Sequence, residues 1–383
     1  MLRNLYVSLI TFFGSIAIIY IVLVIHTFFN LDKSFVYTFK SLENLNFHQK
    51  YSEKLHHIRE ESVMEELWKK PKVEDLLFTS INEVDGEDLT VLFQGDSYME
   101  QLTFQGPKKN YPSSKMVQNF KNKKKISFIN AGTGSYSPSV MSAQLDVLEE
   151  DFKIFPNIVI AYIDQSDIGD ENCRYKYNRI YENGVLKGIK PETYLMWRET
   201  FNYSEVYALS KISLKNTSNI SKSFQLVNFK IKYSITKSSL RFYRKYISQS
   251  DLDKRKLKKC YWTETQRYLI KPREDEIKYF SDQVRNYLNK MEKKKHIEKI
   301  FLVTFPHKKN FNKTYKLNVS DVIDNVIANK KNITHINFSK ILLDDKNFDY
   351  ENIWHADEIH LNAENHGSIF IKKILEELSK YLL

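Results

Sequence analysis

Two rhythms of apolar residues alternate along the chain from residue 89 onward. Short, almost continuous apolar runs are typical of strands buried on both faces of a parallel sheet. Ile158–Ile163 is such a run, and four further segments are predicted as strands, at Leu89–Gln94, Ile126–Asn130, Ile300–Phe305 and Ile333–Phe338. In several of the segments between these strands, the apolar residues are spaced as on one face of a helix. The alternation predicts an α/β fold, with a doubly wound, flavodoxin-like parallel sheet of about five strands and helices on both faces.

The helical segments are amphipathic, and their apolar faces are expected to form the core. One face carries Met141, Leu145, Leu148 and Phe152, a second carries Ile277, Phe280, Val284, Leu288 and Met291, and the terminal one carries Ile371, Ile374, Leu375, Leu378 and Leu382. Residues 319–327 are also expected to be helical. In a sheet of this kind, ligands bind at the carboxyl ends of the strands.

The N-terminus follows a different pattern, because residues 4–31 include no Lys, Arg, Asp or Glu. This apolar stretch is long enough to cross a bilayer as a helix. A cleaved signal peptide is the competing interpretation, but it would have a shorter apolar region and small residues at its cleavage site. We therefore expect an uncleaved single-pass membrane anchor at residues 1–31. Arg3 lies before it and Lys33 and Lys40 lie after it, which leaves its orientation open.

The remaining chain is expected to hold one domain. Residues 35–72 are polar and helix-compatible, so residues 32–88 are interpreted as a solvated stalk and lead-in to a domain at 89–383. Residues 168–272 interrupt the strand–helix alternation and are far longer than a normal connection. Long insertions at the strand ends of α/β domains commonly form lids or substrate walls, which is the role expected here.

Composition narrows the classes of partner. The chain has 383 residues, 42% of them hydrophobic and 27% charged, so a packed core is expected. The net charge is +11, but the lysines are scattered and no basic stripe with interleaved aromatics is present, so nucleic acid is not an expected partner. Cys173 and Cys260 lack the spacing of zinc ligands. They form one disulfide in an oxidising compartment or remain two free thiols.

Two short motifs carry the candidate chemistry. Ser97 stands in Gly95-Asp96-Ser97 directly after a predicted strand, where a hydroxyl is exposed and a following helix favours developing negative charge. Asp357 and His360 lie in a loop before the terminal helix. An acid three residues before a histidine can accept its N–H and leave the other ring nitrogen free to take a proton. Each motif alone also fits ordinary turn or capping chemistry.

Together, these two motifs resemble the SGNH (GDSL-type) hydrolase family. In that family the nucleophile follows the first strand, and the acid and base precede the last helix. The resemblance covers about residue 89 to the C-terminus, apart from the insertion, and it includes Asp357-Glu358-Ile359-His360-Leu361-Asn362 and Asn365-His366-Gly367. It implies that Ser97 is the nucleophile, His360 the general base and Asp357 its orienting partner.

The resemblance also implies an oxyanion hole, to which the backbone N–H of Ser97 contributes. A second backbone N–H follows the second strand, where Gly134 is the natural candidate and an ungapped match on Tyr-Ser-Pro gives Ser135 instead. The family's third block is Gly-x-Asn-Asp, and its Asn supplies the last donor. Here Asp164 replaces the glycine, Ser166 stands where Asn is expected, and Asp167 matches the final acid. A serine hydroxyl can still donate, and Gln165 or a residue of the insertion is the alternative donor.

Other polar residues are interpreted without a catalytic role. His307, Lys308 and Lys309 follow a strand and are interpreted as a surface loop in preference to the mouth of a site. Asp164, Asp167 and Asp170 are interpreted as turn and cap residues, because nothing else nearby has metal-ligand spacing. Neither a metal nor a cofactor is therefore expected.

The resemblance implies a serine-dependent acyl-ester hydrolase, similar to carbohydrate O-acetylesterases. Together with the expected anchor it implies an acylated envelope or secreted glycan as the substrate, and a domain that faces the periplasm or the cell exterior. Two alternatives remain open. One is an O-acyltransferase of polysaccharide modification that uses the same Ser, His and Asp. The other is a catalytically degenerate glycan-binding or scaffold module, which the replaced Asn would explain.

Overall fold

The computed structural model describes residues 2–43, 49–52, 54–59, 77–82, 84, 86–103, 112–191, 209, 211–213, 215–246, 266–343 and 348–383. These residues belong to two compact units, and each is described by itself. The first, called the helical unit below, comprises the described parts of Met1–Phe47 and Glu192–Asp251. The second, called the α/β unit, comprises those of His48–Pro191 and Leu252–Leu383.

The α/β unit is built on a six-stranded sheet in the order β10-β9-β6-β4-β5-β3. Its five parallel strands are β4 (Leu89–Gln94), β5 (Ile126–Asn130), β6 (Ile158–Tyr162), β9 (Lys299–Thr304) and β10 (Ile333–Asn337). The short β3 (Thr79–Ser80) pairs antiparallel with β5 at one edge. This order confirms the predicted doubly wound sheet. The strand order reverses between β4 and β6, where ligands bind in such sheets.

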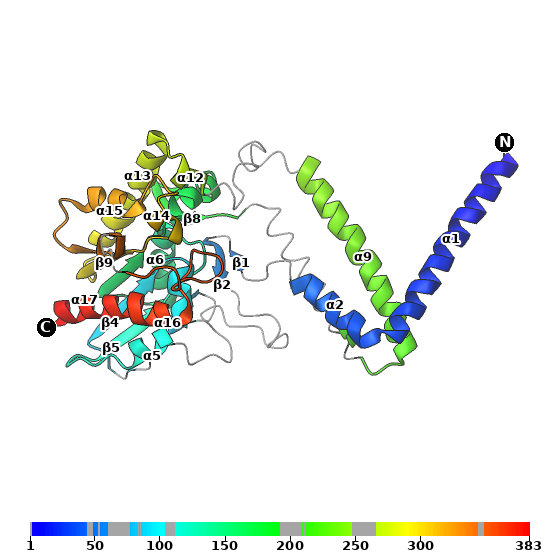
Figure 1. The fold of residues 1–383 in the computed structure, drawn as a ribbon, viewed down its shortest axis with the longest axis horizontal. Coiled ribbons are helices and arrows are strands. Elements are labelled where there is room, and N and C mark those ends of the chain that lie inside the picture. The colour runs from blue at the N-terminus through cyan, green and yellow to red at the C-terminus, as the bar shows by residue number, and fades with distance from the viewer. Residues whose placement is uncertain are drawn as a thin grey trace. The chain divides into compact units, whose positions relative to one another are not determined.

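Helices cover both faces of the sheet. α6 (Pro138–Phe152), α13 (Glu274–Glu292) and α15 (Val319–Ile327) cover one face, and their apolar residues pack with Leu92, Val159 and Leu302. α5 (Pro112–Gln118) and α17 (Lys372–Leu382) cover the other face and pack with Phe93, Ile160 and Val303 (Figure 1). All five residues of β6 are buried, as expected for a central strand whose sequence is continuously apolar.

The structure differs from the expected polar lead-in at residues 49–59. These residues form an antiparallel pair, β1 (Gln49–Ser52) and β2 (His56–Arg59), and not a solvated helix. Leu55 and Ile58 are buried in the same core cluster as α6, and Leu55 bridges to Ile189. Apolar burial of these two side chains therefore ties the lead-in to the α/β unit.

The insertion at 168–272 is divided between the two units. Its two ends lie in the α/β unit, where they form α7 (Asp167–Gly169), the hairpin of β7 (Arg179–Glu182) and β8 (Val185–Ile189), and α12 (Arg267–Ile270). Its middle includes α9 (Asn219–Tyr246), which belongs to the helical unit. Cys173 is disulfide-bonded, and Cys260 lies outside the described residues.

The helical unit consists of α1 (Leu2–Phe29), α2 (Leu31–Glu43) and α9. Residues Tyr6–Phe29 of α1 are long and apolar enough to cross a membrane. α9 crosses the C-terminal part of α1 next to α2 (Figure 1). There Tyr20 donates its hydroxyl to Oδ1 of Asn228 at 2.9 Å, and Val24 is buried. By length and composition alone, α1 fits either an anchor or a signal sequence.

Candidate active site

Ser97 begins a short helix at the carboxyl end of β4. Gly95 precedes it with φ of 152°, and a Cβ at that position would lie 2.8 Å from Cβ of Tyr162, so only glycine fits this turn. Asp96 caps the helix α4 (Ser97–Glu100) by accepting the N–H of Tyr98 at 2.8 Å. The turn therefore holds the Ser97 hydroxyl at the switch point of the sheet, which is the place between β4 and β6 where the strand order reverses.

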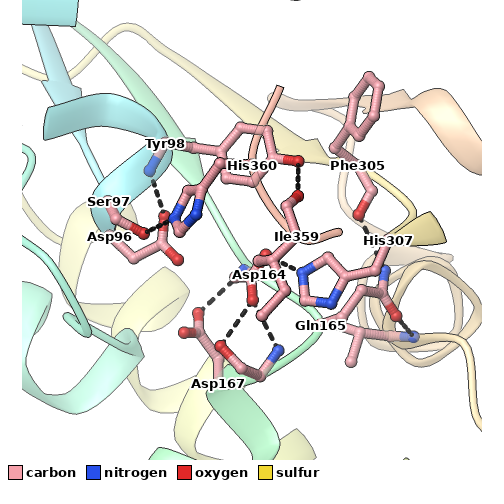
Figure 2. A network of polar contacts seen from close by, with 12 residues as sticks. Asp96, Ser97, Tyr98, Asp164, Gln165, Asp167, Phe305, His307, Ile359 and His360 are labelled. Carbon is pink, nitrogen blue, oxygen red and sulfur yellow. Dashed lines mark hydrogen bonds and ion pairs between the residues drawn. The ribbon is translucent and has the colours of Figure 1, made fainter. Parts of the chain in front are cut away.

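The structure brings Ser97, His360 and Asp357 together (Figure 2). Oγ of Ser97 lies 2.6 Å from Nε2 of His360. Nδ1 of the same imidazole lies 2.6 Å from Oδ2 of Asp357. A hydroxyl, an imidazole and a carboxylate in this order form the arrangement in which a histidine can remove the serine proton.

The loop that carries His360 is held in place before any substrate binds. Oδ1 of Asp357 accepts the backbone N–H groups of Ile359 at 2.9 Å and His360 at 3.0 Å. Partial burial alone would raise the pKa of Asp357, but hydrogen bonds from the His360 ring and these N–H groups bring it well below its usual value. Tyr98 donates its hydroxyl to the carbonyl of Ile359 at 2.5 Å, which ties the loop to α4 (Figure 2).

A second histidine, His366 in Asn365-His366-Gly367, contacts the helix that begins with Ser97. It is fully buried, with Nδ1 2.6 Å from Oγ of Ser113 and Nε2 2.8 Å from the carbonyl of Tyr98. Burial lowers its pKa to about 4, although the hydrogen bond with the Tyr98 carbonyl acts in the opposite direction. His366 is therefore neutral near pH 7 and joins α5 to α4.

The backbone after β5 differs from the expectation at Gly134. The N–H of Gly134 donates to Oε2 of Glu100 at 2.9 Å, so it is already engaged. Ser135, the other candidate, lines the same pocket as Ser97. Its φ is 65°, and within the described part of the chain its N–H makes no hydrogen bond. Ser135 is thus better placed than Gly134 to donate to a substrate.

The residues at the position of the family's third block, Asp164–Asp167, form a buried network around Asp164 (Figure 2). Ser166 donates both its N–H, at 2.7 Å, and its hydroxyl, at 2.6 Å, to Oδ2 of Asp164. Oδ1 of Asp164 accepts the hydroxyl of Tyr162 at 2.9 Å and lies 2.8 Å from Nε2 of His307. The hydroxyl proton of Ser166 is therefore used inside the protein and is not directed at a substrate.

Gln165 and Asp167, from the same segment, also use their side chains for hydrogen bonds inside the protein. Gln165 is buried, accepting the N–H of Val319 and donating to the carbonyl of Phe305. Asp167 is buried too, and its Oδ2 accepts the N–H of Asp164 at 3.1 Å. Burial raises the pKa of Asp167 well above its usual value, and the charges of Asp96 and Asp164 add to this. Neither residue lines the pocket around Ser97.

The pocket beside Ser97 is a cavity of about 60 Å³. Its walls combine the switch point with both ends of the insertion and include Ser135, Ser166, Asp170, Arg174, Gln266, Leu269, His307 and Tyr315. Burial raises the pKa of Asp170 to about 6, although Arg174, whose Nε lies 3.5 Å from Oδ1 of Asp170, opposes the shift. In the part of the chain that the structure describes, no group of three His, Cys, Asp or Glu side chains is arranged to hold a metal ion.

Comparison with known proteins finds distant structural likeness. No protein-family model matches the chain, and no curated protein shows a significant match. A mutant of Axe2, an acetyl-xylooligosaccharide esterase from Geobacillus stearothermophilus, is similar with a TM-score of 0.40 and 13% identity, over 76% of this chain and 95% of that chain. A catalytic mutant of Axe2, an acetylxylan esterase, is similar with a TM-score of 0.38 and 13% identity, over 77% and 95%.

Sequence reasoning missed the pair of His307 and Asp164. The interpretation of His307 as a surface residue is wrong, since its side chain is 1% exposed and lines the pocket. A signal existed, because both residues directly follow central strands and the carboxyl ends of such strands meet at one edge of the sheet. Arg174 and Gln266 had no comparable signal, because the insertion that carries them shows no strand–helix rhythm.

Proposed function

We propose that this protein is a serine-dependent acyl-ester hydrolase of the SGNH type. The observation that carries the proposal is the chain of contacts from Oγ of Ser97 to Nε2 of His360 and from Nδ1 of His360 to Asp357, each 2.6 Å long. Its position at the switch point of a doubly wound sheet supports the same conclusion. The resemblance of both motifs to SGNH hydrolases agrees with it.

The reaction follows from the order of these contacts. Oγ of Ser97 attacks the ester carbonyl carbon while Nε2 of His360 takes the hydroxyl proton, and the imidazolium is stabilised by the ionised Asp357. His360 then returns the proton to the leaving alcohol as the carbon–oxygen bond breaks. Water, deprotonated by the same imidazole, releases the acid from the acyl-serine and restores the hydroxyl.

The oxyanion is proposed to bind to backbone N–H groups of Ser97 and Ser135. Both residues line the pocket, and neither N–H makes a hydrogen bond within the described ranges. The Gly134 N–H and the Ser166 hydroxyl are engaged elsewhere, as described above. With two backbone donors in place of three groups, transition-state stabilisation is expected to be weaker by about 2.7–4 kcal/mol than with the full set.

The size of the cavity supports a short acyl group. About 60 Å³ holds only a few water molecules, which suits an acetyl group better than a long chain. An acylated carbohydrate of the envelope or of a secreted glycan is the proposed substrate, as the sequence resemblance implies. The disulfide at Cys173 supports an oxidising, extracytoplasmic compartment for the α/β unit.

We further propose that α1 is retained as a membrane anchor. Val24 and Thr27 of α1 are buried in the helical unit, and Tyr20 bonds to Asn228 of α9. Cleavage of α1 as a signal peptide would expose the apolar residues of α9 that face it. This packing favours the anchor over the signal sequence.

Labelling by a fluorophosphonate probe tests the hydrolase proposal. The full chain is expected to be labelled, Ser97→Ala to be unlabelled and His360→Ala to be labelled much more slowly. Ser368→Ala, which removes an exposed helix hydroxyl, is the matched control and should label like the wild type. The wild type should also cleave 4-nitrophenyl acetate in preference to 4-nitrophenyl octanoate. Absence of labelling in the folded wild type would refute the proposal.

A non-catalytic glycan-binding module is the second candidate. The engaged Ser166 hydroxyl and Gly134 N–H favour it, because they leave fewer donors for an oxyanion. It predicts binding of an acetylated oligosaccharide by wild type and Ser97→Ala alike, with no labelling of either. Transfer of the acetyl group to an added oligosaccharide in preference to water would instead identify an acyltransferase that uses the same residues.

A further inference from the structure

A groove in the helical unit lies between α1, α2 and α9. Its volume is about 650 Å³, within the range of sites that hold small molecules. Apolar side chains of α1 and α9 form its walls, namely Leu23, Val227, Ile231 and Ile235. Lys33 of α2 and Lys230 of α9 also line it, and no Asp or Glu does. The groove therefore combines an apolar wall with two cationic groups.

The exposed surface of α9 continues the apolar wall. Ile231 and Ile235 are 40% and 62% exposed, and Ile220, Phe224 and Phe242 are exposed as well. At 3.6 residues per turn, these five positions fall within about 60° of one another around the helix. A stripe of this kind is unusual on a surface that faces only water.

All the charged residues of α9 are basic. Its 28 residues include no Asp or Glu and seven basic residues, Lys222, Lys230, Lys232, Lys237, Arg241, Arg244 and Lys245. A helix with an exposed apolar stripe and an otherwise basic composition is typical of helices that lie in the interface of an anionic membrane. Long lysine side chains can reach the headgroups from such a position.

The position of the groove along α1 agrees with a location at the membrane interface. Its residues on α1 and α2 run from Leu23 to Tyr37, so they lie at the end of the apolar segment Tyr6–Phe29. If α1 crosses the bilayer, as proposed above, that end lies where acyl chains meet headgroups.

We propose that the groove between α1, α2 and α9 binds an anionic phospholipid, with Lys33 and Lys230 on its phosphate and with Leu23, Ile231 and Ile235 against its acyl chain. α9 then attaches the insertion to the membrane surface beside the anchor. The proposal rests on the retained anchor and is independent of the ester chemistry at Ser97.

The test uses the full chain in detergent micelles, titrated with a phosphatidylglycerol or a phosphatidylcholine of the same acyl chains, with bound lipid counted by native mass spectrometry. Phosphatidylglycerol is expected to bind at least about tenfold more tightly than phosphatidylcholine. Lys33→Gln combined with Lys230→Gln should weaken phosphatidylglycerol binding about tenfold. The matched control, Lys232→Gln combined with Lys237→Gln, removes the same charge outside the groove and should change binding less than about twofold.

Two further variants, Ile235→Glu and Ser97→Ala, test the apolar wall of the groove and its independence from the ester chemistry. Ile235→Glu changes an exposed position, so it should fold. It places a carboxylate against the acyl chain, which is costly to desolvate, so it should weaken phosphatidylglycerol binding about tenfold. Ser97→Ala should bind lipid like the wild type, so failure of the hydrolase proposal leaves this result unaffected. Equal binding of the two lipids, an equal loss in both lysine pairs, or displacement of the lipid by equimolar inorganic phosphate would each overturn the proposal.

Discussion

Nε2 of His307 lies 2.8 Å from Oδ1 of Asp164, and each side chain is 1% exposed. Burial alone would raise the pKa of Asp164, but the charge and hydrogen bond of His307, with two hydrogen bonds from Ser166, bring it well below its usual value. Asp164 is therefore an ionised carboxylate inside the protein, next to the pocket of Ser97. A buried carboxylate–imidazole pair therefore stands where the third block of the family has Gly-x-Asn.

Removing one partner of this pair should be costly. His307→Ala leaves the ionised Asp164 carboxylate buried without its imidazole partner, and we expect the free energy of unfolding to fall by about 3–5 kcal/mol in denaturant titrations. The control is His335→Ala, whose partner Asp324 lies 2.7 Å away but is 28% exposed, so water can replace the imidazole. A loss for His307→Ala no larger than for His335→Ala would contradict this stabilising role of the buried His307–Asp164 pair.

Asp357 should act through His360 and not through the substrate. In Asp357→Asn the amide favours the wrong tautomer of His360, so kcat is expected to fall by up to about 10⁴-fold while KM changes little. Steady-state hydrolysis of an acetyl ester measures both constants. Glu358→Gln is the neighbouring control, because Glu358 pairs with Lys308 and does not contact the imidazole. Similar kcat values for the two variants would argue against the proposed role of Asp357.

Gly132 should tolerate no side chain. A Cβ there would lie 2.4 Å from Cβ of Met99 and 2.5 Å from the backbone nitrogen of Glu100, in the helix that begins with Ser97. We expect Gly132→Ala to displace this helix, to lower the free energy of unfolding by about 1–3 kcal/mol and to abolish most fluorophosphonate labelling. Gly14→Ala, where a Cβ meets nothing within 4 Å, should leave both measurements unchanged.

Buried His366 should make stability fall in acid. Its pKa is lowered to about 4 in the folded protein, against 6.5 for an ordinary histidine, so between these values the unfolded chain binds the proton more readily. Stability from the neutral ring is present above pH 6.5 and is lost as the pH falls to 4, by about 1.4 kcal/mol per unit of pKa difference.

The comparison with His366→Asn isolates this contribution. The stability advantage of the wild type, measured by thermal unfolding from pH 7 to pH 4, is expected to shrink as the pH falls. Asp170 titrates in the same range, since its pKa is raised to about 6, but it is present in both proteins and cancels in the difference. An advantage that stays constant over this range would mean that His366 is not held neutral by burial.

The sequence by itself determined the five parallel strands of the α/β unit and its main amphipathic helices. The predicted strand limits at Leu89–Gln94 and Ile126–Asn130 are those of β4 and β5, and Val319–Ile327 is helical as expected. Local rules are sufficient here, because the period of the apolar residues decides between strand and helix. The motifs at Ser97 and Asp357–His360 were also readable, since their order along the chain implies one edge of the sheet.

Only the tertiary structure decided how the polar groups are shared. Glu100 engages the Gly134 N–H and leaves Ser135 facing the pocket, while Asp164 takes the Ser166 hydroxyl and buries His307. The same holds for the insertion, whose two ends line the pocket of Ser97 while α9, in its middle, packs on α1. Apart from the local bond between Asp164 and Ser166, each of these contacts joins segments far apart in the chain. A hydrogen bond or an apolar contact has no local period, so no pattern in the sequence records which distant partner satisfies it.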